Sequence, residues 1–271
     1  TFREAGIHNV KISAGYRLSY PDEKLFTFYL DEFETKLFDL QEGVYTCLIE
    51  NEDCEEQILT PGMDDEIFSR TKVPMTKNEV RVLSISRLEL TKNAVVYDVG
   101  SGTGSVSAEC ARLSPDIFVF AIEQKEEAAN LTKENAARLG LLDQIVVINK
   151  KAPEGFEELP TPTHVFIGGS SGALSDILSA IQKKLIAKEN TKGKTDKASK
   201  RVRVVINAVS LETIAQITKL IQTYPVAHVQ LTQIQASRAH KLGSYNLMQA
   251  QNPVLIASFD LLPDDKIEAD E

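Results

Sequence analysis

The chain has 271 residues, enough for one large domain or for one domain with a fragment of another. A net charge of −9 argues against a duplex-DNA binder, and a hydrophobic fraction of 42% is ordinary for a soluble globular protein. No signal peptide is visible in the given sequence, and no transmembrane helix is expected, because no apolar run is long enough. Three irregularly spaced cysteines favour a reducing cytoplasm, and four scattered histidines give no metal-binding pattern.

The first 60 residues contain too few predicted elements to bury a core alone. Segment 9–16 predicts a strand, segment 22–40 has apolar residues at largely helical spacing, and segment 43–51 is rich in β-formers. Segment 60–68 is interpreted as a turn and linker. We therefore predict that residues 1–60 belong to a separate domain and that residues 61–271 form the main domain.

From about residue 70 onward, strands and helices alternate. The predicted strands are 94–99, 117–123, 144–149, 163–168, 202–207, 227–235 and 253–259, and the predicted helices are 76–88, 105–113, 125–139, 172–186 and 210–223. The early strands are continuous apolar runs, as in parallel sheets covered on both faces. This pattern predicts a doubly wound, mostly parallel α/β fold with ligands at the carboxyl ends of the strands. The Lys-rich segment 188–201 predicts a disordered loop.

Five small residues, 100–104, follow the first strand of this alternation. Such a turn before a helix lets backbone N–H groups approach a ligand. The dinucleotide fingerprint would need glycine at position 105, where the chain has Ser105. The glycine spacing, with Asp98 in front of it, instead resembles motif I of class I methyltransferases, which bind S-adenosylmethionine. Asp98 suits the ammonium group of that donor, directly or through water.

The next strand ends in Glu123, where an acidic side chain can accept hydrogen bonds from both ribose hydroxyls. The helix after it contains Asn135 and ends at Gly140, which matches a common helix ending of the same methyltransferases. Turn, acidic residue and helix together are a more specific signal than the glycines alone. They predict a Rossmann-like class I methyltransferase.

Several segments resemble one family within this fold, the decarboxylating precorrin methyltransferases of cobalamin (vitamin B12) biosynthesis. The matching segments are VPMTKNEVR (73–81), DVGSGTGSVSAECA (98–111), AIEQ (121–124), KAPE (151–154), FIGGSSGAL (166–174), NAVSLET (207–213) and NPV (252–254). The resemblance covers about residues 62–260. Residues 1–60 resemble the tail of a tetrapyrrole methylase domain, the C5-methylating half of a fused C5,15-methylating enzyme.

The resemblance implies a set of donor-binding residues: Thr76, Asp98, Gly100, Ser101, Gly102, Thr103, Gly104, Glu123 and Ala152. Thr76 and Glu79 also form the pattern of a capping box at a helix start. Relatives often have Gly-Asp before the alanine, whereas this chain has Lys150 and Lys151. The resemblance therefore leaves a backbone contact of Ala152 to adenine and removes an Asp side-chain contact.

The resemblance also implies the reaction and the partners. The substrate is a precorrin-6 type tetrapyrrole, methylated at C15 with decarboxylation of the ring C acetate, by a homo-oligomer, a tetramer. An acidic protein must hold this polycarboxylate with local positive charge, and we expect Arg81 and Arg238 to do so. Ser170 and Ser171 lie in a Gly/Ser segment that leaves room for a large flat substrate.

No residue is assigned a catalytic role, because an electron-rich ring carbon attacks the donor methyl in line and the protein mainly positions the reactants. One alternative is a class I methyltransferase acting on another small molecule, a protein or RNA. Nucleic-acid methyltransferases often carry N-P-P-Y or D-P-P-Y where this chain has Gly and Ser at 168–172. Another alternative is a nucleotide-binding module without chemistry, which the intact glycines and Glu123 disfavour.

Overall fold

The structure is a computed structural model that describes residues 9–32, 42–52, 60–191 and 201–263. The chain divides into two compact units. The first contains residues 1–58 and 137–139, and the second contains residues 59–136 and 140–271.

The first unit contains a three-stranded antiparallel sheet of order β2-β1-β3. Its strands are β1 (Val10–Tyr16), β2 (Lys24–Tyr29) and β3 (Tyr45–Asn51), and the 3-10 turn η1 (Leu30–Glu32) follows β2. The prediction of a helix over 22–40 is wrong for residues 24–29, which form β2. Phe28 is buried opposite Ile12 while Leu25 is exposed, so burial in this segment follows the two-residue period of a strand. Residues 33–40 lie outside the described part.

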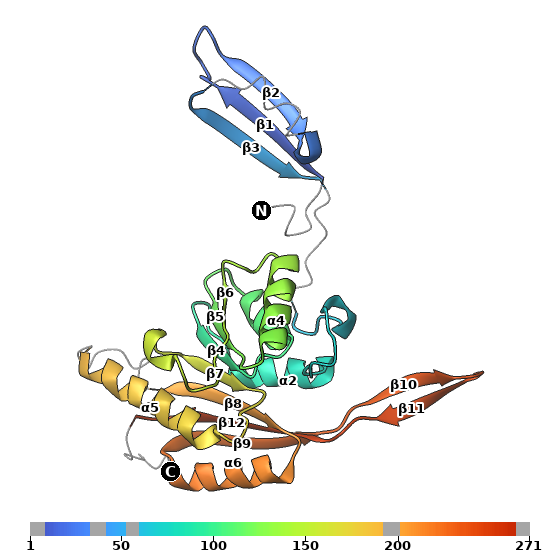
Figure 1. Ribbon diagram of the computed structural model, residues 1–271, viewed down its shortest axis with the longest axis vertical. Coiled ribbons are helices and arrows are strands. Elements are labelled where there is room, and N and C mark those ends of the chain that lie inside the picture. Colours follow the sequence, from blue (N-terminus) through green and yellow to red (C-terminus); the bar gives the residue numbers. More distant parts are fainter. Residues whose placement is uncertain (1–8, 33–41, 53–59, 192–200, 264–271) are drawn as a thin grey trace. The chain divides into compact units, whose positions relative to one another are not determined.

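The second unit is built on a seven-stranded sheet of order β6-β5-β4-β7-β8-β12-β9 (Figure 1). The strands are β4 (Val95–Val99), β5 (Phe118–Ile122), β6 (Ile145–Ile148), β7 (His164–Ile167), β8 (Val202–Ala208), β9 (Val226–Ile234) and β12 (Val254–Leu261). Strands β4 to β8 are parallel, and β12 runs antiparallel to β8 and β9. The predicted doubly wound fold is confirmed.

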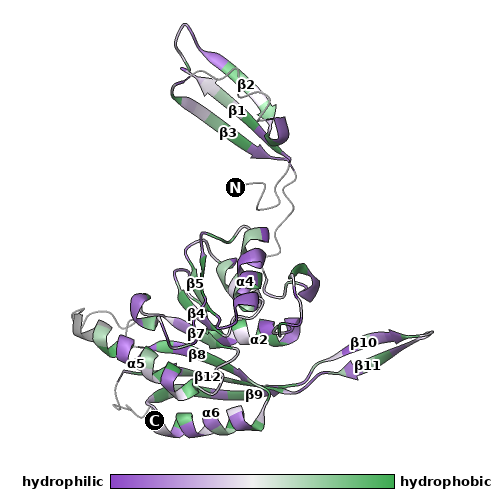
Figure 2. Ribbon diagram, viewed as in Figure 1, coloured by the Kyte–Doolittle hydropathy of each residue, from purple (hydrophilic) through white to green (hydrophobic). Residues whose placement is uncertain are grey.

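Helices cover both faces of this sheet. They are α2 (Asn78–Leu88), α3 (Ser105–Ala111), α4 (Glu126–Arg138), α5 (Leu174–Thr191) and α6 (Leu211–Thr223). Tyr97 and Val99 of β4 pack in one core with residues of α5 and α6, whereas Asp98 between them contacts α3. Figure 2 shows the sheet strands as mainly hydrophobic. Of the loop predicted at 188–201, residues 192–200 lie outside the described part, and α5 continues to Thr191.

Two further strands, β10 (Ser237–Leu242) and β11 (Tyr245–Ala250), pair only with each other and extend beyond the sheet as a hairpin (Figure 1). The sequence analysis missed this hairpin. Its strands are almost entirely exposed, so they lack the apolar alternation of a half-buried strand. Among the described helices, none has the length and apolar character needed to cross a bilayer.

Segment 60–68 is not the free linker that the sequence predicts. It contains the 3-10 turn η3 (Asp65–Ile67), and both Asp65 and Phe68 are buried. The buried carboxylate of Glu109 in α3 accepts hydrogen bonds from the backbone N–H groups of Gly62 and Met63, at 2.9 and 2.7 Å. The helix after the glycine turn therefore holds this segment against the core.

Arg81 of α2 connects segment 60–68 to both α2 and α3. Its guanidinium is fully buried and lies 3.1 Å from Asp65 and 3.2 Å from Glu109. It also donates to the carbonyls of Met63 and Thr76 and stacks over the Phe68 ring. The buried positive charge thus has two carboxylates and two carbonyls as partners, which is what a buried charge requires.

We predict that Arg81→Leu lowers the free energy of unfolding by about 3–5 kcal/mol, because Asp65 and Glu109 lose the fully buried cation that they share. Arg112→Leu is the matched control, since Arg112 also pairs with Glu109 but at 3.4 Å and with a partly exposed side chain. The control should cost no more than about 1 kcal/mol. Urea unfolding of both variants measures the difference, and equal losses would contradict the structural role of Arg81.

Candidate functional site

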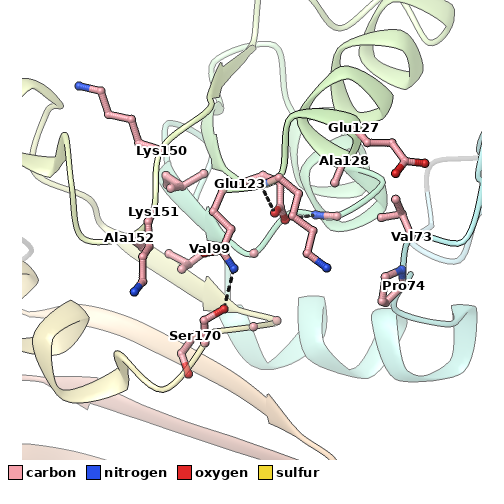
Figure 3. Close-up of a pocket in the computed structure, with 18 of the residues that line it drawn as sticks. Val73, Pro74, Val99, Glu123, Glu127, Ala128, Lys150, Lys151, Ala152 and Ser170 are labelled. Carbon is pink, nitrogen blue, oxygen red and sulfur yellow. Dashed lines mark hydrogen bonds between the residues drawn. The ribbon is translucent and has the colours of Figure 1, made fainter.

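A cavity of about 440 Å³ opens at the carboxyl ends of β4, β5 and β7. This is the place where the strand order reverses and where ligands bind in doubly wound sheets. Its lining comes from five segments of the chain: 72–74, then Val99, Gly100 and Gly102, then 122–125 with Glu127 and Ala128, then 150–152, and finally 168–171. In Figure 3, Glu123 lies between Lys151 and Ala152 on one side and Val73 and Pro74 on the other. We call this space the first cavity.

The glycine turn has no room for larger residues, because atoms of the protein itself fill the space that their side chains would need. A Cβ at Gly100 would lie 2.6 Å from the carbonyl oxygen of Gly169, and a Cβ at Gly102 would lie 2.7 Å from that of Pro74. A Cβ at Gly104 would lie 2.7 Å from Thr132 of α4. All three glycines also have positive φ angles, between 59° and 75°. Because these positions lack side chains, the turn can lie directly against the segments that contain Pro74, Thr132 and Gly169.

Glu123 faces the first cavity from the end of β5 and is 8% exposed. Its two carboxylate oxygens accept from the backbone N–H groups of Lys125, at 2.9 Å, and Gly102, at 3.2 Å. The N–H of Gly100 donates to the carbonyl of Ile122. The turn amides that the sequence analysis assigned to a ligand are thus used within the protein, and they hold Glu123 in place.

Asp98 does not line the first cavity. Its carboxyl group is buried beneath the turn, where it accepts a hydrogen bond of 2.5 Å from Ser107. Its second oxygen has no partner among the described residues. Burial raises the pKa of Asp98 to about 6, and the charge of Glu123 adds to the increase. Its side chain faces α3, so Asp98 is not placed for a direct contact with a ligand in the first cavity, and a contact through water stays a prediction.

A second cavity of about 790 Å³ lies on the other side of the turn and shares Pro74, Gly100 and Gly168 with the first. Its apolar lining includes Val80, Val209 and Val254. Its polar lining consists of Thr76, Lys77, Ser101, Asn207, Arg238, His240, Gln249, Gln251 and Asn252. Among the described residues that line it, none is acidic.

Arg238 of β10 joins the hairpin to α2 at this second cavity. Its guanidinium donates to both oxygens of Glu79, at 2.6 and 2.7 Å, and to Asp65 at 2.9 Å. These bonds lower the pKa of Glu79. The predicted capping box is wrong, because Glu79 is held by Arg238. The backbone N–H of Asn78 donates to the carboxylate of Asp65, which lies 13 residues earlier in the sequence.

The predicted site residues thus separate into three groups. Gly100, Gly102, Glu123, Ala152, Ser170 and Ser171 line the first cavity, whereas Thr76, Ser101 and Arg238 line the second, with Gly100 shared. Asp98, Thr103, Gly104 and Arg81 line neither. The expected contact of Arg81 with substrate is corrected, because its side chain is 0% exposed and bound on all sides.

Sequence reasoning missed much of both linings. In the first cavity it missed Val73 and Pro74, which come from the segment packed on Gly102, and Gln124, which donates to Ser171 at 2.7 Å. In the second it missed Asn207 at the end of β8 and the hairpin residue His240. The Gly243-Ser244 pair was the available signal for the hairpin, since Gly243 has a φ of 61°.

We predict that Gly104→Ala lowers the free energy of unfolding by about 1–3 kcal/mol more than Gly140→Ala does. Both glycines have positive φ, 75° and 67°, but only Gly104 has a neighbour within 4 Å of the added Cβ. The difference in urea unfolding therefore measures the packing of the turn on α4. Equal effects would show that the turn does not need this close contact.

A second prediction concerns pH. The pKa of Asp98, about 6, exceeds that of an unfolded aspartate, about 3.9, so the folded state binds the proton more tightly. The stability that this proton contributes is present at pH 4 and lost as the pH rises through 6. Asp98→Asn should remove this fall, a difference from the parent chain of about 2–3 kcal/mol between pH 4 and 7. Parallel pH profiles of unfolding would contradict it.

Comparisons with known proteins agree with this geometry. A family model described as a precorrin methyltransferase domain matches residues 66–260. A Pyrobaculum calidifontis protein, described as a probable cobalt-precorrin-6B C(15)-methyltransferase (decarboxylating), is 36% identical over 199 residues, 73% of this chain and 94% of that protein.

Two solved structures are similar over the same region. The precorrin-6Y C5,15-methyltransferase from Geobacter metallireducens GS-15 has a TM-score of 0.64 and 30% identity, covering 74% of this chain and 96% of that one. The C-terminal domain of the Rhodobacter capsulatus precorrin-6Y C5,15-methyltransferase has a TM-score of 0.61 and 27% identity, covering 75% and 100%. With its class I fold and paired cavities, the chain belongs to the precorrin methyltransferase family.

Proposed function

We propose that the chain transfers a methyl group from S-adenosylmethionine to C15 of a precorrin-6 type tetrapyrrole and removes the carboxyl group of the ring C acetate as CO2. The observation that supports this best is the shared wall of the two cavities, formed by Pro74, Gly100 and Gly168. A donor in the first cavity and an acceptor in the second would meet across the glycine turn. Such adjacency is what in-line transfer needs.

The first cavity fits the donor chemically. The Glu123 carboxylate is mostly withdrawn from water but lines the cavity, so it can accept hydrogen bonds from ribose hydroxyls. Ala152 offers backbone on the opposite side, where an adenine would lie. The unpartnered oxygen of Asp98 places negative potential beneath the turn, which favours a cationic ligand. When bound, S-adenosylmethionine supplies an electrophilic methyl group.

The second cavity fits a large acceptor with carboxylate groups. Its volume of about 790 Å³ lies in the upper part of the range of small-molecule sites. Valines can pack on the face of a macrocycle, while Lys77 and Arg238 offer positive charge to acetate or propionate groups. The Arg238 contact that the sequence predicts remains a proposal, and Arg238 would share its guanidinium between substrate and the carboxylates of Glu79 and Asp65.

Three further assignments are proposals that follow from the family resemblance. Residues 1–60 belong to a tetrapyrrole methylase domain. The chain forms a homo-oligomer, a tetramer, and the exposed Leu242, Tyr245 and Met248 of the hairpin are apolar surface available for contact with a second copy; sedimentation equilibrium measures this state. The enzyme acts in the cytoplasm, which the free thiols of Cys47 and Cys110 support.

The experiment supplies the chain with S-adenosylmethionine and cobalt-precorrin-6B and measures adenosylhomocysteine and CO2. We expect both products in equal amounts. Glu123→Gln should weaken the binding of adenosylhomocysteine by about 10–100-fold in calorimetry, because it removes a charged hydrogen-bond acceptor from the first cavity.

Glu126→Gln is the control, because Glu126 carries the same charge three residues later on α4 and does not line the first cavity. It should bind adenosylhomocysteine as the parent chain does. Unchanged affinity in Glu123→Gln would remove Glu123 from the donor site. Adenosylhomocysteine without CO2, formed only with other acceptors, would disprove the tetrapyrrole substrate.

A further inference from the structure

His240 lines the second cavity from the β10–β11 hairpin. Side chains two residues apart on a strand lie on the same face, so His240 faces the same side as Arg238. That side is fixed, because Arg238 is bound by Glu79 of α2 and by Asp65. The ion pairs at Arg238 therefore hold the imidazole of His240 over the cavity that we assign to the tetrapyrrole.

The proposed reaction needs a group that moves a proton. When the ring carbon takes the methyl group, it still bears its own hydrogen and the macrocycle becomes cationic. Decarboxylation then breaks the bond between the acetate methylene and its carboxylate, and the electron pair of that bond neutralises the ring, leaving an exocyclic methylene. To finish as a methyl group, this methylene must gain a proton, and the methylated ring carbon must lose one. The proton count closes without any other reactant.

Few lining groups can perform this transfer. The hydroxyls of Thr76 and Ser101 and the amides of Asn207, Gln249, Gln251 and Asn252 exchange protons poorly as acids or bases near neutral pH. Arg238 stays protonated and is held by two carboxylates. A lysine ammonium is a hydrogen-bond donor without an acceptor position, so Lys77 does not fit the proton-accepting half of the transfer. Imidazole is the side chain that both accepts and donates a proton near neutrality.

We propose that His240 is the proton-transferring residue of this reaction, taking the proton from the methylated ring carbon and delivering one to the methylene left by CO2. The inference rests on the proposed function and deepens it. The imidazole takes up one proton and gives up one in each reaction, so the same residue serves every turnover. Because one proton leaves and one arrives, the decarboxylated intermediate and the final product are isomers, which mass cannot distinguish but visible absorption can.

The test is single-turnover mixing of the enzyme with S-adenosylmethionine and cobalt-precorrin-6B, following adenosylhomocysteine, CO2 and the visible spectrum. In His240→Gln we expect the first two signals within a few-fold of the parent enzyme. The last spectral change should slow by about 100-fold. Added imidazole should restore part of this rate in His240→Ala, which also shows that the variant is folded. Lys241→Gln, on the same strand but outside the cavity lining, is the control and should behave as the parent.

The outcomes distinguish a failure of the proposed function from a failure of the role of His240. A parent enzyme that forms neither adenosylhomocysteine nor CO2 from cobalt-precorrin-6B or from its metal-free form disproves the proposed function and the role of His240 with it. A parent enzyme that completes the reaction, beside a His240→Gln variant that reaches the final spectrum as fast, overturns the role of His240 alone. Equal slowing of all three signals also overturns it, since this would assign His240 to substrate binding.

Discussion

The architecture of the site depends on backbone contacts that leave no space for a Cβ at the turn after β4. A side chain at Gly100 would collide with the backbone of Gly169, and one at Gly102 would collide with the carbonyl of Pro74. Larger residues would therefore push apart the walls that the two cavities have in common. The glycines therefore act through packing, because they allow the two cavities to share Pro74, Gly100 and Gly168 as lining.

Buried charge fixes the remaining walls. Glu109, Arg81 and Asp65 form a chain of ion pairs from α3 through α2 to the segment before it. Asp65 also binds Arg238, so the chain continues to the hairpin. Each of these charges is expensive to bury alone and is stable only with its partners. The network therefore fixes the position of segment 60–78 through directional contacts to named partners. Within it, segment 73–76 contributes to the lining of both cavities.

The sequence predicted the sheet of the second unit to within a few residues per strand, because strands such as Phe118–Ile122 form continuous apolar runs. It failed where that signal is missing or ambiguous. Strand β2 is a short aromatic cluster that fits either period, and the hairpin is exposed on both faces. Arg81 was assigned to substrate because a polycarboxylate needs positive charge, and its burial was not foreseen because its partners lie 16 and 28 residues away in sequence.

The two cavities differ in how the fold supports them. The first is enclosed by the ends of parallel strands whose core side chains are buried, so its shape follows from the sheet itself. The second has one wall on a hairpin whose strands pair only with each other, and a two-stranded ribbon is marginally stable alone. The position of the hairpin depends on the ion pairs of Arg238. The Arg238 side chain is 40% exposed, so salt weakens these ion pairs. Carboxylates of a bound acceptor would compete with Glu79 and Asp65 for the same guanidinium, so acceptor binding and hairpin placement are coupled through one side chain.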